Sequence, residues 1–126
     1  MSIALPTVAI VDDDAAVCTG VQRFLRSVGW TATIFTSGTA FLASLAAATP
    51  DCVILDIVMP AMTGPEVFLH IRKMGLALPV IFMSAEDRLN LTGCEGVPVP
   101  IGFLHKPFEG DELLRLITTA TAKPLG

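Results

Sequence analysis

The sequence has few charged side chains: Asp, Glu, Lys and Arg make up only 16% of its 126 residues. Soluble domains usually contain about 25%. Hydrophobic residues make up 52%, so the chain does not belong to the charge-rich, apolar-poor sequences that remain disordered. The length is sufficient for one sizeable hydrophobic core and predicts a single domain.

Basic residues are also scarce, because 8 Lys and Arg stand against 12 Asp and Glu and give a net charge of −4. Binding to nucleic acid requires a basic face that neutralises phosphates. We therefore expect no direct nucleic acid binding by this chain.

Long apolar runs and paired cysteines are missing as well. The longest segment without an ionisable side chain, residues 27–50, has a polar stretch at its centre, whereas a membrane-spanning helix needs about 20 predominantly apolar residues. The N-terminus shows no secretory signal pattern. The three cysteines, Cys18, Cys52 and Cys94, are odd in number and widely spaced. Together these features predict reduced thiols in a cytoplasmic protein with no membrane segment.

Short apolar segments alternate with segments of helical periodicity. The expected strands are residues 7–11, 31–35, 52–55, 79–83 and 101–104, and the expected helices are residues 15–28, 37–45, 65–74 and a last helix capped by Asp111. This alternation predicts an α/β protein with a parallel sheet covered on both faces. Its length fits a flavodoxin-like (βα)5 fold with strand order 2-1-3-4-5. Gly and Pro interrupt residues 86–100, so we expect a short or irregular fourth helix there.

Polar residues follow four of the expected strands. They are Asp12, Asp13 and Asp14, then Asp56, then Ser84, then Lys106. Ligands of open α/β sheets bind at the carboxyl ends of the strands. Clustered carboxylates suit Mg²⁺, and a carboxylate can accept a phosphoryl group as a nucleophile. Lys106 and Ser84 could then stabilise the transferred group, whereas Asp14 is better explained as a helix N-cap.

Four motifs in order resemble the CheY-like receiver domain of two-component response regulators, in a form closest to FixJ-type receivers. The motifs are IVDDDAAV (residues 10–17), LDIVMPAMTG (55–64), FMSAED (82–87) and GFLHKPF (102–108). The resemblance covers essentially the whole chain and implies one receiver domain over residues 5–122, with no output domain following it.

The resemblance also implies roles for individual residues. Asp56 would be the phosphoacceptor, and Asp12, Asp13, Asp56 and the backbone carbonyl of Val58 would hold Mg²⁺. Ser84 and Lys106 would contact the phosphoryl group, with Lys106 preceding a cis peptide to Pro107. Ser84 and Phe103 would be the switch residues. The donor would be a phosphohistidine on a sensor histidine kinase or a histidine phosphotransfer protein, the receiver would catalyse its own dephosphorylation, and a downstream output domain or protein would respond. Such a domain is not a conventional enzyme.

Two other functions fit parts of the pattern. Asp12-x-Asp14 after a strand is weakly similar to the DxD motif of haloacid dehalogenase-like phosphatases, which also use Mg²⁺. Those enzymes need a further acidic metal motif, where this chain has Lys106 and Pro107. The irregular residues 86–100 favour a phosphorylation-independent interaction module on a receiver scaffold, but the presence of Asp56, Ser84 and Lys106 argues against it.

Overall fold

The computed structural model describes residues 6–85 and 102–121. Five parallel strands form one sheet in the order β2-β1-β3-β4-β5. The strands are β1 (Thr7–Val11), β2 (Thr31–Phe35), β3 (Cys52–Asp56), β4 (Val80–Ser84) and β5 (Gly102–His105). The predicted fold class and strand order are therefore confirmed.

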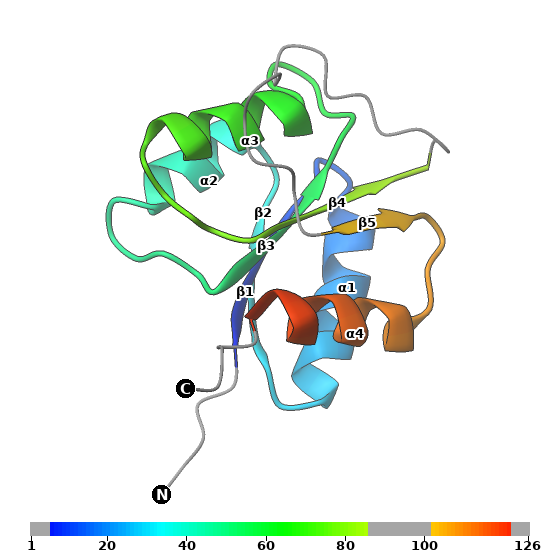
Figure 1. The fold of residues 1–126 in the computed structure, drawn as a ribbon. Helices are drawn as coiled ribbons and strands as arrows, with labels where there is room; N and C mark the ends of the chain where they lie inside the picture. The colour runs from blue at the N-terminus through cyan, green and yellow to red at the C-terminus, as the bar shows by residue number, and fades with distance from the viewer. Residues whose placement is uncertain (1–5, 86–101, 122–126) are drawn as a thin grey trace, which may run out of the picture.

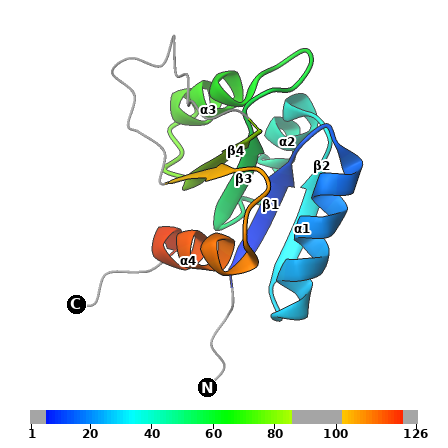
Figure 2. The ribbon, with the colours of Figure 1, turned by 90° about the vertical axis from the view of Figure 1, so that its right-hand side faces the viewer.

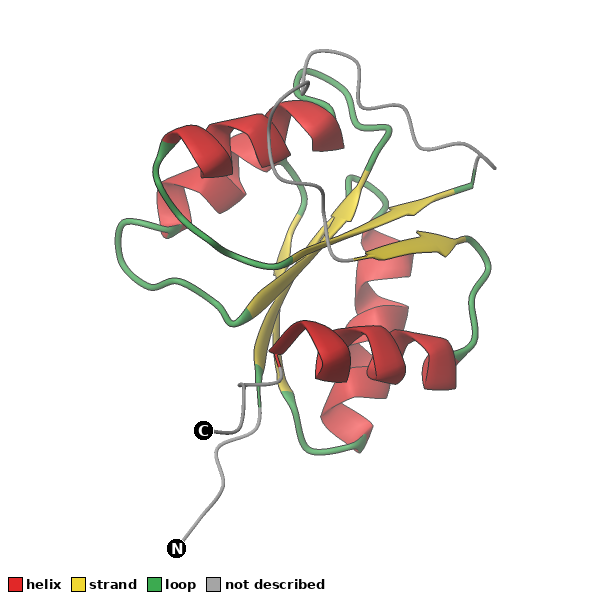
Figure 3. Ribbon diagram, in the orientation of Figure 1, coloured by secondary structure: helices red, strands yellow, loops and turns green. Residues whose placement is uncertain are grey.

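Four helices are described, and they cover the sheet on both faces (Figures 1, 2 and 3). They are α1 (Ala15–Ser27), α2 (Gly38–Ser44), α3 (Gly64–Lys73) and α4 (Gly110–Thr121). Helices α2 and α3 pack on one face, and α1 and α4 pack on the other. None of these helices is long and apolar enough to cross a membrane.

Each face of the sheet has its own hydrophobic core, because successive strand residues point to opposite faces. In β3, Val53 and Leu55 belong to the core under α2 and α3, and Ile54 belongs to the core under α1 and α4. All three side chains are fully buried. The apolar composition noted above follows from this double burial.

Three helix starts have side-chain caps that hold the loops at the carboxyl ends of the strands. The Asp14 carboxylate accepts hydrogen bonds from the Ala16 and Val17 amides, which confirms its predicted N-cap role. Ser37 caps α2, and its hydroxyl accepts a hydrogen bond from the Ala40 amide. Thr63 and Glu66 form a reciprocal capping box at the start of α3.

Several predicted boundaries differ from the structure by one or two residues, and one prediction lies outside the described residues. Helix α4 begins at Gly110, so Asp111 lies inside its first turn instead of capping it. An acidic residue is favourable at either position, because the helix dipole is positive there. The short or irregular fourth helix expected over residues 86–100 falls outside the described part of the chain.

Candidate functional site

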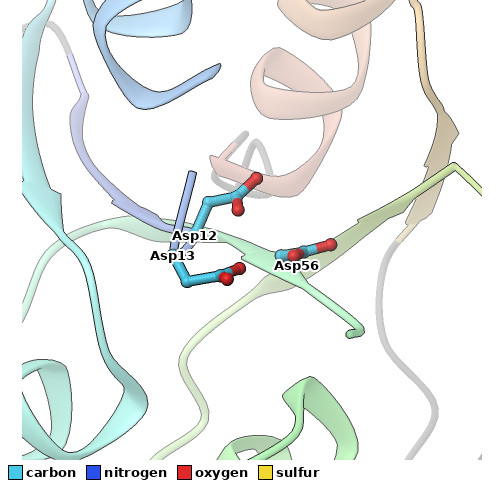
Figure 4. A group of neighbouring side chains, drawn as sticks. All are labelled: Asp12, Asp13 and Asp56. Atoms are coloured by element: carbon cyan, nitrogen blue, oxygen red, sulfur yellow. The ribbon is translucent and has the colours of Figure 1, made fainter. Parts of the chain in front are cut away.

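The polar residues predicted at the strand ends lie together at one edge of the sheet. Asp12 and Asp13 follow β1, Asp56 and Ser84 end β3 and β4, and Lys106 follows β5. They line one cavity of about 340 Å³ with Asp14, Val58 and Ala85. In Figure 4 the carboxylates of Asp12, Asp13 and Asp56 approach one another from the ends of β1 and β3.

Three residues of this cavity are polar and buried. Asp12 is 0% exposed, Ser84 is 1% exposed and Asp56 is 5% exposed. In residues 6–85 and 102–121 they are the only buried residues with polar or charged side chains. Burying a polar group costs free energy unless it finds partners, so this concentration at one sheet edge marks a functional site.

The ammonium group of Lys106 joins two of the carboxylates. Its Nζ donates to Asp12 Oδ2 at 2.8 Å and to Asp56 Oδ1 at 3.4 Å. The backbone amide of Lys106 donates to the Ser84 carbonyl at 2.7 Å, which ties the ends of β4 and β5 together. The peptide bond to Pro107 is cis, as expected.

The Asp12 carboxylate is fixed by its own surroundings. Its Oδ1 accepts the Asp14 amide at 2.9 Å while its Oδ2 accepts Lys106. The Cys18 thiol donates to the Asp12 backbone carbonyl at 3.3 Å from the buried side of α1. Both oxygens of the Asp12 carboxylate, and its backbone carbonyl, therefore have partners within the chain.

Electrostatics in the cavity favour an additional cation. Burial and the neighbouring Asp12 charge raise the pKa of Asp56 to about 6, and Lys106 only partly offsets them. Burial lowers the pKa of Lys106, but its hydrogen bond to Asp12 and the charges of Asp56 and Asp12 outweigh this effect and raise the pKa above its ordinary value. A bound cation would offset the repulsion between the crowded carboxylates and favour their charged form.

The donor set fits a hard divalent ion. Asp12, Asp13 and Asp56 each place one carboxylate oxygen within 4.8 Å of the others. Asp13 is exposed, so one side of the cluster is open to solvent. Mg²⁺ prefers oxygen ligands, takes one or two carboxylates and keeps several waters. This combination of buried and exposed carboxylates therefore suits an Mg²⁺ ion that keeps part of its water shell.

The loop after Asp56 is held tightly beneath the site. The Gly64 amide donates to the Ile57 carbonyl at 2.9 Å, and Ala61 adopts a positive φ of 68°. A Cβ at Gly64 would overlap the backbone carbonyl of Asp56. Glycine at this position therefore allows α3 to start directly against the chain that carries Asp56.

Of the two other predicted site residues, Val58 lines the cavity and Phe103 does not. The Val58 residue is 57% exposed. Phe103 lies on β5, partly buried against the core under α2 and α3, and is not among the residues that line the cavity. Cys18 and Cys52 are free and buried, and burial raises the pKa of each thiol, whereas Cys94 lies outside the described residues.

Sequence reasoning missed two supports of the site. The Asp14 amide and the Cys18 thiol both orient the Asp12 segment. An amide carries no sequence signal, and a cysteine on an apolar helix face is indistinguishable from an ordinary core residue.

Comparison with known proteins connects this geometry to one family. The family model described as "Response regulator receiver domain" matches residues 8–118. The response regulator protein TmoT of Ectopseudomonas mendocina is 36% identical over 111 residues, which are 88% of this chain and 50% of that protein. The chain spans between 24% and 53% of the length of the first curated relatives it matches.

Solved structures give the same result. A response regulator receiver protein from Burkholderia phymatum is 39% identical, with a TM-score of 0.77, over 96% of this chain and 100% of that one. The structure titled FixJ-N has a TM-score of 0.84 over 100% of this chain and 99% of that one, at 24% identity. The second likeness concerns the fold alone.

Proposed function

Because this chain belongs to the response regulator receiver domain family, we propose that it is the phosphoacceptor domain of a two-component phosphorelay, with Asp56 as the acceptor. The observation that carries the proposal is the pairing of a buried carboxylate with an ammonium group and two further carboxylates. Asp56 lies 3.4 Å from the Lys106 ammonium in a cavity that Asp12 and Asp13 also line. The family is not a conventional enzyme family, and the proposed chemistry is carried out by the domain on itself.

In the proposed reaction, a carboxylate oxygen of Asp56 attacks the phosphorus of a phosphohistidine. The P–N bond breaks, a P–O bond forms, and the imidazole leaves and takes up a proton. Lys106 is placed to pair with an oxygen of the transferred group, and Ser84 lines the same cavity. Attack of water on the phosphorus then releases phosphate and returns the carboxylate, which is autodephosphorylation.

Asp13, Asp56 and the Val58 carbonyl would hold Mg²⁺, with Asp12 nearby. When bound, the ion supplies positive charge against the phosphoryl oxygens. The residues of the chain do the remaining work: Asp56 is the nucleophile, and Lys106 neutralises charge. Both oxygens of Asp12 already have partners, which supports an indirect role through water.

Signalling would use Ser84 and Phe103 as switch residues. Moving a two-state equilibrium from 1:99 to 99:1 takes about 5.5 kcal/mol of differential binding. One charge-assisted hydrogen bond contributes about 1.5–3 kcal/mol. A Ser84 hydroxyl bond to the phosphoryl group is therefore too weak alone, and the Lys106 pair and a downstream partner must supply the rest.

The proposed donor is a sensor histidine kinase or a histidine phosphotransfer protein, since a receiver domain implies a histidine kinase partner. We propose residues 5–122 as the domain and the cytoplasm as its location, on the basis of the family and of the odd number and wide spacing of the cysteines. The response would pass to an output domain or a separate protein, because the curated relatives are longer than this chain.

A second candidate is a phosphorylation-independent binding module on the same scaffold. The phosphatase alternative is weaker, because Lys106 occupies the strand end where such an enzyme needs another acidic residue. Measurement of a phosphoryl adduct distinguishes a phosphoacceptor domain from a binding module and from a phosphatase.

The test is the intact mass of the protein after incubation with Mg²⁺ and a small phosphodonor, or with a phosphorylated kinase. We expect one phosphoryl adduct on the wild type, none on Asp56→Asn, and a normal adduct on Asp111→Asn, a matched control at an exposed position of α4. Absence of an adduct with every donor would favour the binding module. Steady turnover of a phosphoester that depends on Asp12 would favour the phosphatase.

A further inference from the structure

Each hydrogen-bonding group of Asp12 has a partner within the chain. Its amide donates to the Phe35 carbonyl at 3.1 Å, and its two carboxylate oxygens accept from the Asp14 amide and the Lys106 ammonium. Its backbone carbonyl accepts from the Cys18 thiol at 3.3 Å. Of these partners, two are backbone groups and one is charged. Cys18 is therefore the uncharged side chain that holds this residue.

The carbonyl that Cys18 holds belongs to the peptide bond between Asp12 and Asp13. Because a peptide unit is planar, a hydrogen bond that fixes the carbonyl also fixes the direction in which the chain continues to the Cα atom of Asp13. Asp13 is exposed, and among residues 6–85 and 102–121 no group donates a hydrogen bond to its carboxylate. The orientation of Asp13 before a ligand binds therefore depends on the backbone that precedes it.

Cys18 reaches this peptide from a buried, apolar face of α1. The residue is 0% exposed, and it belongs with Val21 and Leu25 to the core under α1 and α4. Asp12 is also 0% exposed, so without the thiol its carbonyl would be a buried acceptor shielded from solvent. An acceptor in that state costs free energy. Rotation of the peptide would relieve this cost and would move Asp13.

Cys52 provides a comparison within the same molecule. It is also 0% exposed and lies in the same core, but it begins β3, at the opposite end of the strand from Asp56. Its sulfur lies 3.9 Å from the carbonyl of the next residue, Val53, and Cys52 does not line the cavity at the strand ends. The two cysteines share burial and core, and only Cys18 contacts the site.

We propose that Cys18 is a positioning residue for the metal site: its thiol holds the peptide between Asp12 and Asp13 and thereby presents the exposed Asp13 carboxylate to the divalent ion. The inference rests on the magnesium site of the proposed function. Cys18 itself contacts neither the ion nor the phosphoryl group. Groups that orient metal ligands from outside the coordination shell strengthen metal binding, and a thiol is a weak donor, so the contribution is that of one ordinary hydrogen bond.

The first test compares Mg²⁺ affinities by isothermal titration calorimetry, without any phosphodonor. Cys18→Ala removes the donor, and we expect it to bind Mg²⁺ about three- to tenfold more weakly than the wild type, as for the loss of one neutral hydrogen bond. Cys18→Ser keeps a donor in a side chain of nearly the size of alanine and should stay within about twofold of the wild type. Equal affinities in Cys18→Ala and Cys18→Ser would overturn the proposal.

Urea unfolding without Mg²⁺ separates positioning from a merely structural role. Cys18→Ala and Cys52→Ala both leave a cavity in the same core, so we expect both to unfold at a lower urea concentration than the wild type. Only Cys18→Ala should lose Mg²⁺ affinity. An equal loss in Cys52→Ala would mean that any defect in this core weakens the site, and would overturn the proposal. If Cys18→Ala does not fold, Cys18→Val fills the volume of the thiol without a donor and carries the same expectation of weaker binding.

The second test needs no metal. The ¹⁵N relaxation of the Asp13 amide should give a lower order parameter in Cys18→Ala or Cys18→Val than in the wild type and Cys18→Ser, because the peptide before it is no longer held. Equal order parameters in all of these proteins would contradict the assigned role. A phosphoryl adduct on wild-type Asp56 together with unchanged Mg²⁺ affinity in Cys18→Ala would refute only this inference. Weaker Mg²⁺ binding in Cys18→Ala, with no adduct on the wild type, would refute only the phosphoacceptor function.

Discussion

The interiors and the carboxyl ends of the central strands differ in chemistry but not in burial. Every residue of β3 and β4 is buried, yet β3 changes from apolar residues to Asp56 at its last position, and β4 changes to Ser84. Folding alone favours an apolar residue at a buried position. The comparison teaches that the strand interiors stabilise this domain, whereas the strand ends place buried polar groups, at a cost in stability, around the acidic cavity.

The largest expected effect lies in the strand interior. Phe82 is fully buried, and its ring packs edge-to-face against Phe68 with centroids 5.8 Å apart. We expect Phe82→Ala to reduce the free energy of unfolding by about 3–5 kcal/mol, because the lost ring leaves a cavity. Urea unfolding measures this loss. A loss in the free energy of unfolding no larger than that of a substitution at an exposed position would contradict the stabilising role of the strand interior.

The next effect concerns the backbone beneath the strand end. Gly64→Ala places a methyl group against the Asp56 carbonyl and the Ile57 backbone. We expect a loss of about 3 kcal/mol, near the upper end for overpacking, because backbone atoms cannot move aside easily. Gly20→Ala is the control, since no atom lies within 4 Å of the added Cβ. It should stabilise α1 by about 0.5–1 kcal/mol. Equal effects at the two glycines, measured by urea unfolding, would contradict this account.

Mg²⁺ bound at the strand ends should increase the free energy of unfolding of the domain. At a Mg²⁺ concentration 100 times its dissociation constant, the free energy of unfolding should rise by about 2.7 kcal/mol. Asp13→Asn should lose this gain at the same concentration, because it removes the exposed carboxylate of the cluster. Asp111→Asn on α4 should keep it. Thermal unfolding with and without Mg²⁺ measures the difference, and an equal gain in all three proteins would place the ion elsewhere.

The smallest effect is a gain in stability from neutralising Asp56 when no metal is present. Its pKa is about 6 in the folded protein, against an ordinary value of 3.8. A raised carboxyl pKa means that the folded state binds the proton more tightly. Stability is therefore lost as pH rises from about 4 to about 6, and the full cost applies above that range.

Asp56→Asn removes this cost. In a metal chelator at pH 8 we expect the variant to be about 2 kcal/mol more stable than the wild type. The shift of about two pKa units corresponds to about 3 kcal/mol at most, and solvent screening in the open cavity reduces this gain. The gain should shrink below pH 6 and disappear near pH 4. Unfolding curves at several pH values measure it. A variant that is less stable at pH 8, or a gain that grows as the pH falls, would contradict the assigned cause.

The fold was predictable because its signals are local and repeated. Apolar β-branched segments such as Thr7–Val11 alternate with amphipathic helices, and parallel topology follows from that order. The group of strand-end residues was predictable for the same reason, since parallel strands end at one edge of the sheet. The start of α4 at Gly110 was missed by two residues, because Asp111 is as favourable in the first turn of a helix as at its cap.

Side-chain geometry could not be predicted. No pattern in the sequence indicates that Lys106 lies closer to Asp12 than to Asp56. That preference depends on the Asp14 amide, which turns the Asp12 carboxylate toward the lysine. The burial that raises the pKa of Asp56 likewise results from the packing of the whole sheet edge.

The most direct test of the central claim is identification of the residue that carries the phosphoryl group. Reduction of the phosphorylated protein with borohydride converts an acyl phosphate into an alcohol at the modified residue, which peptide mass mapping then locates. The account predicts modification at Asp56 alone, dependent on Mg²⁺. Modification at Asp12 or Asp13, or at no aspartate, would contradict it.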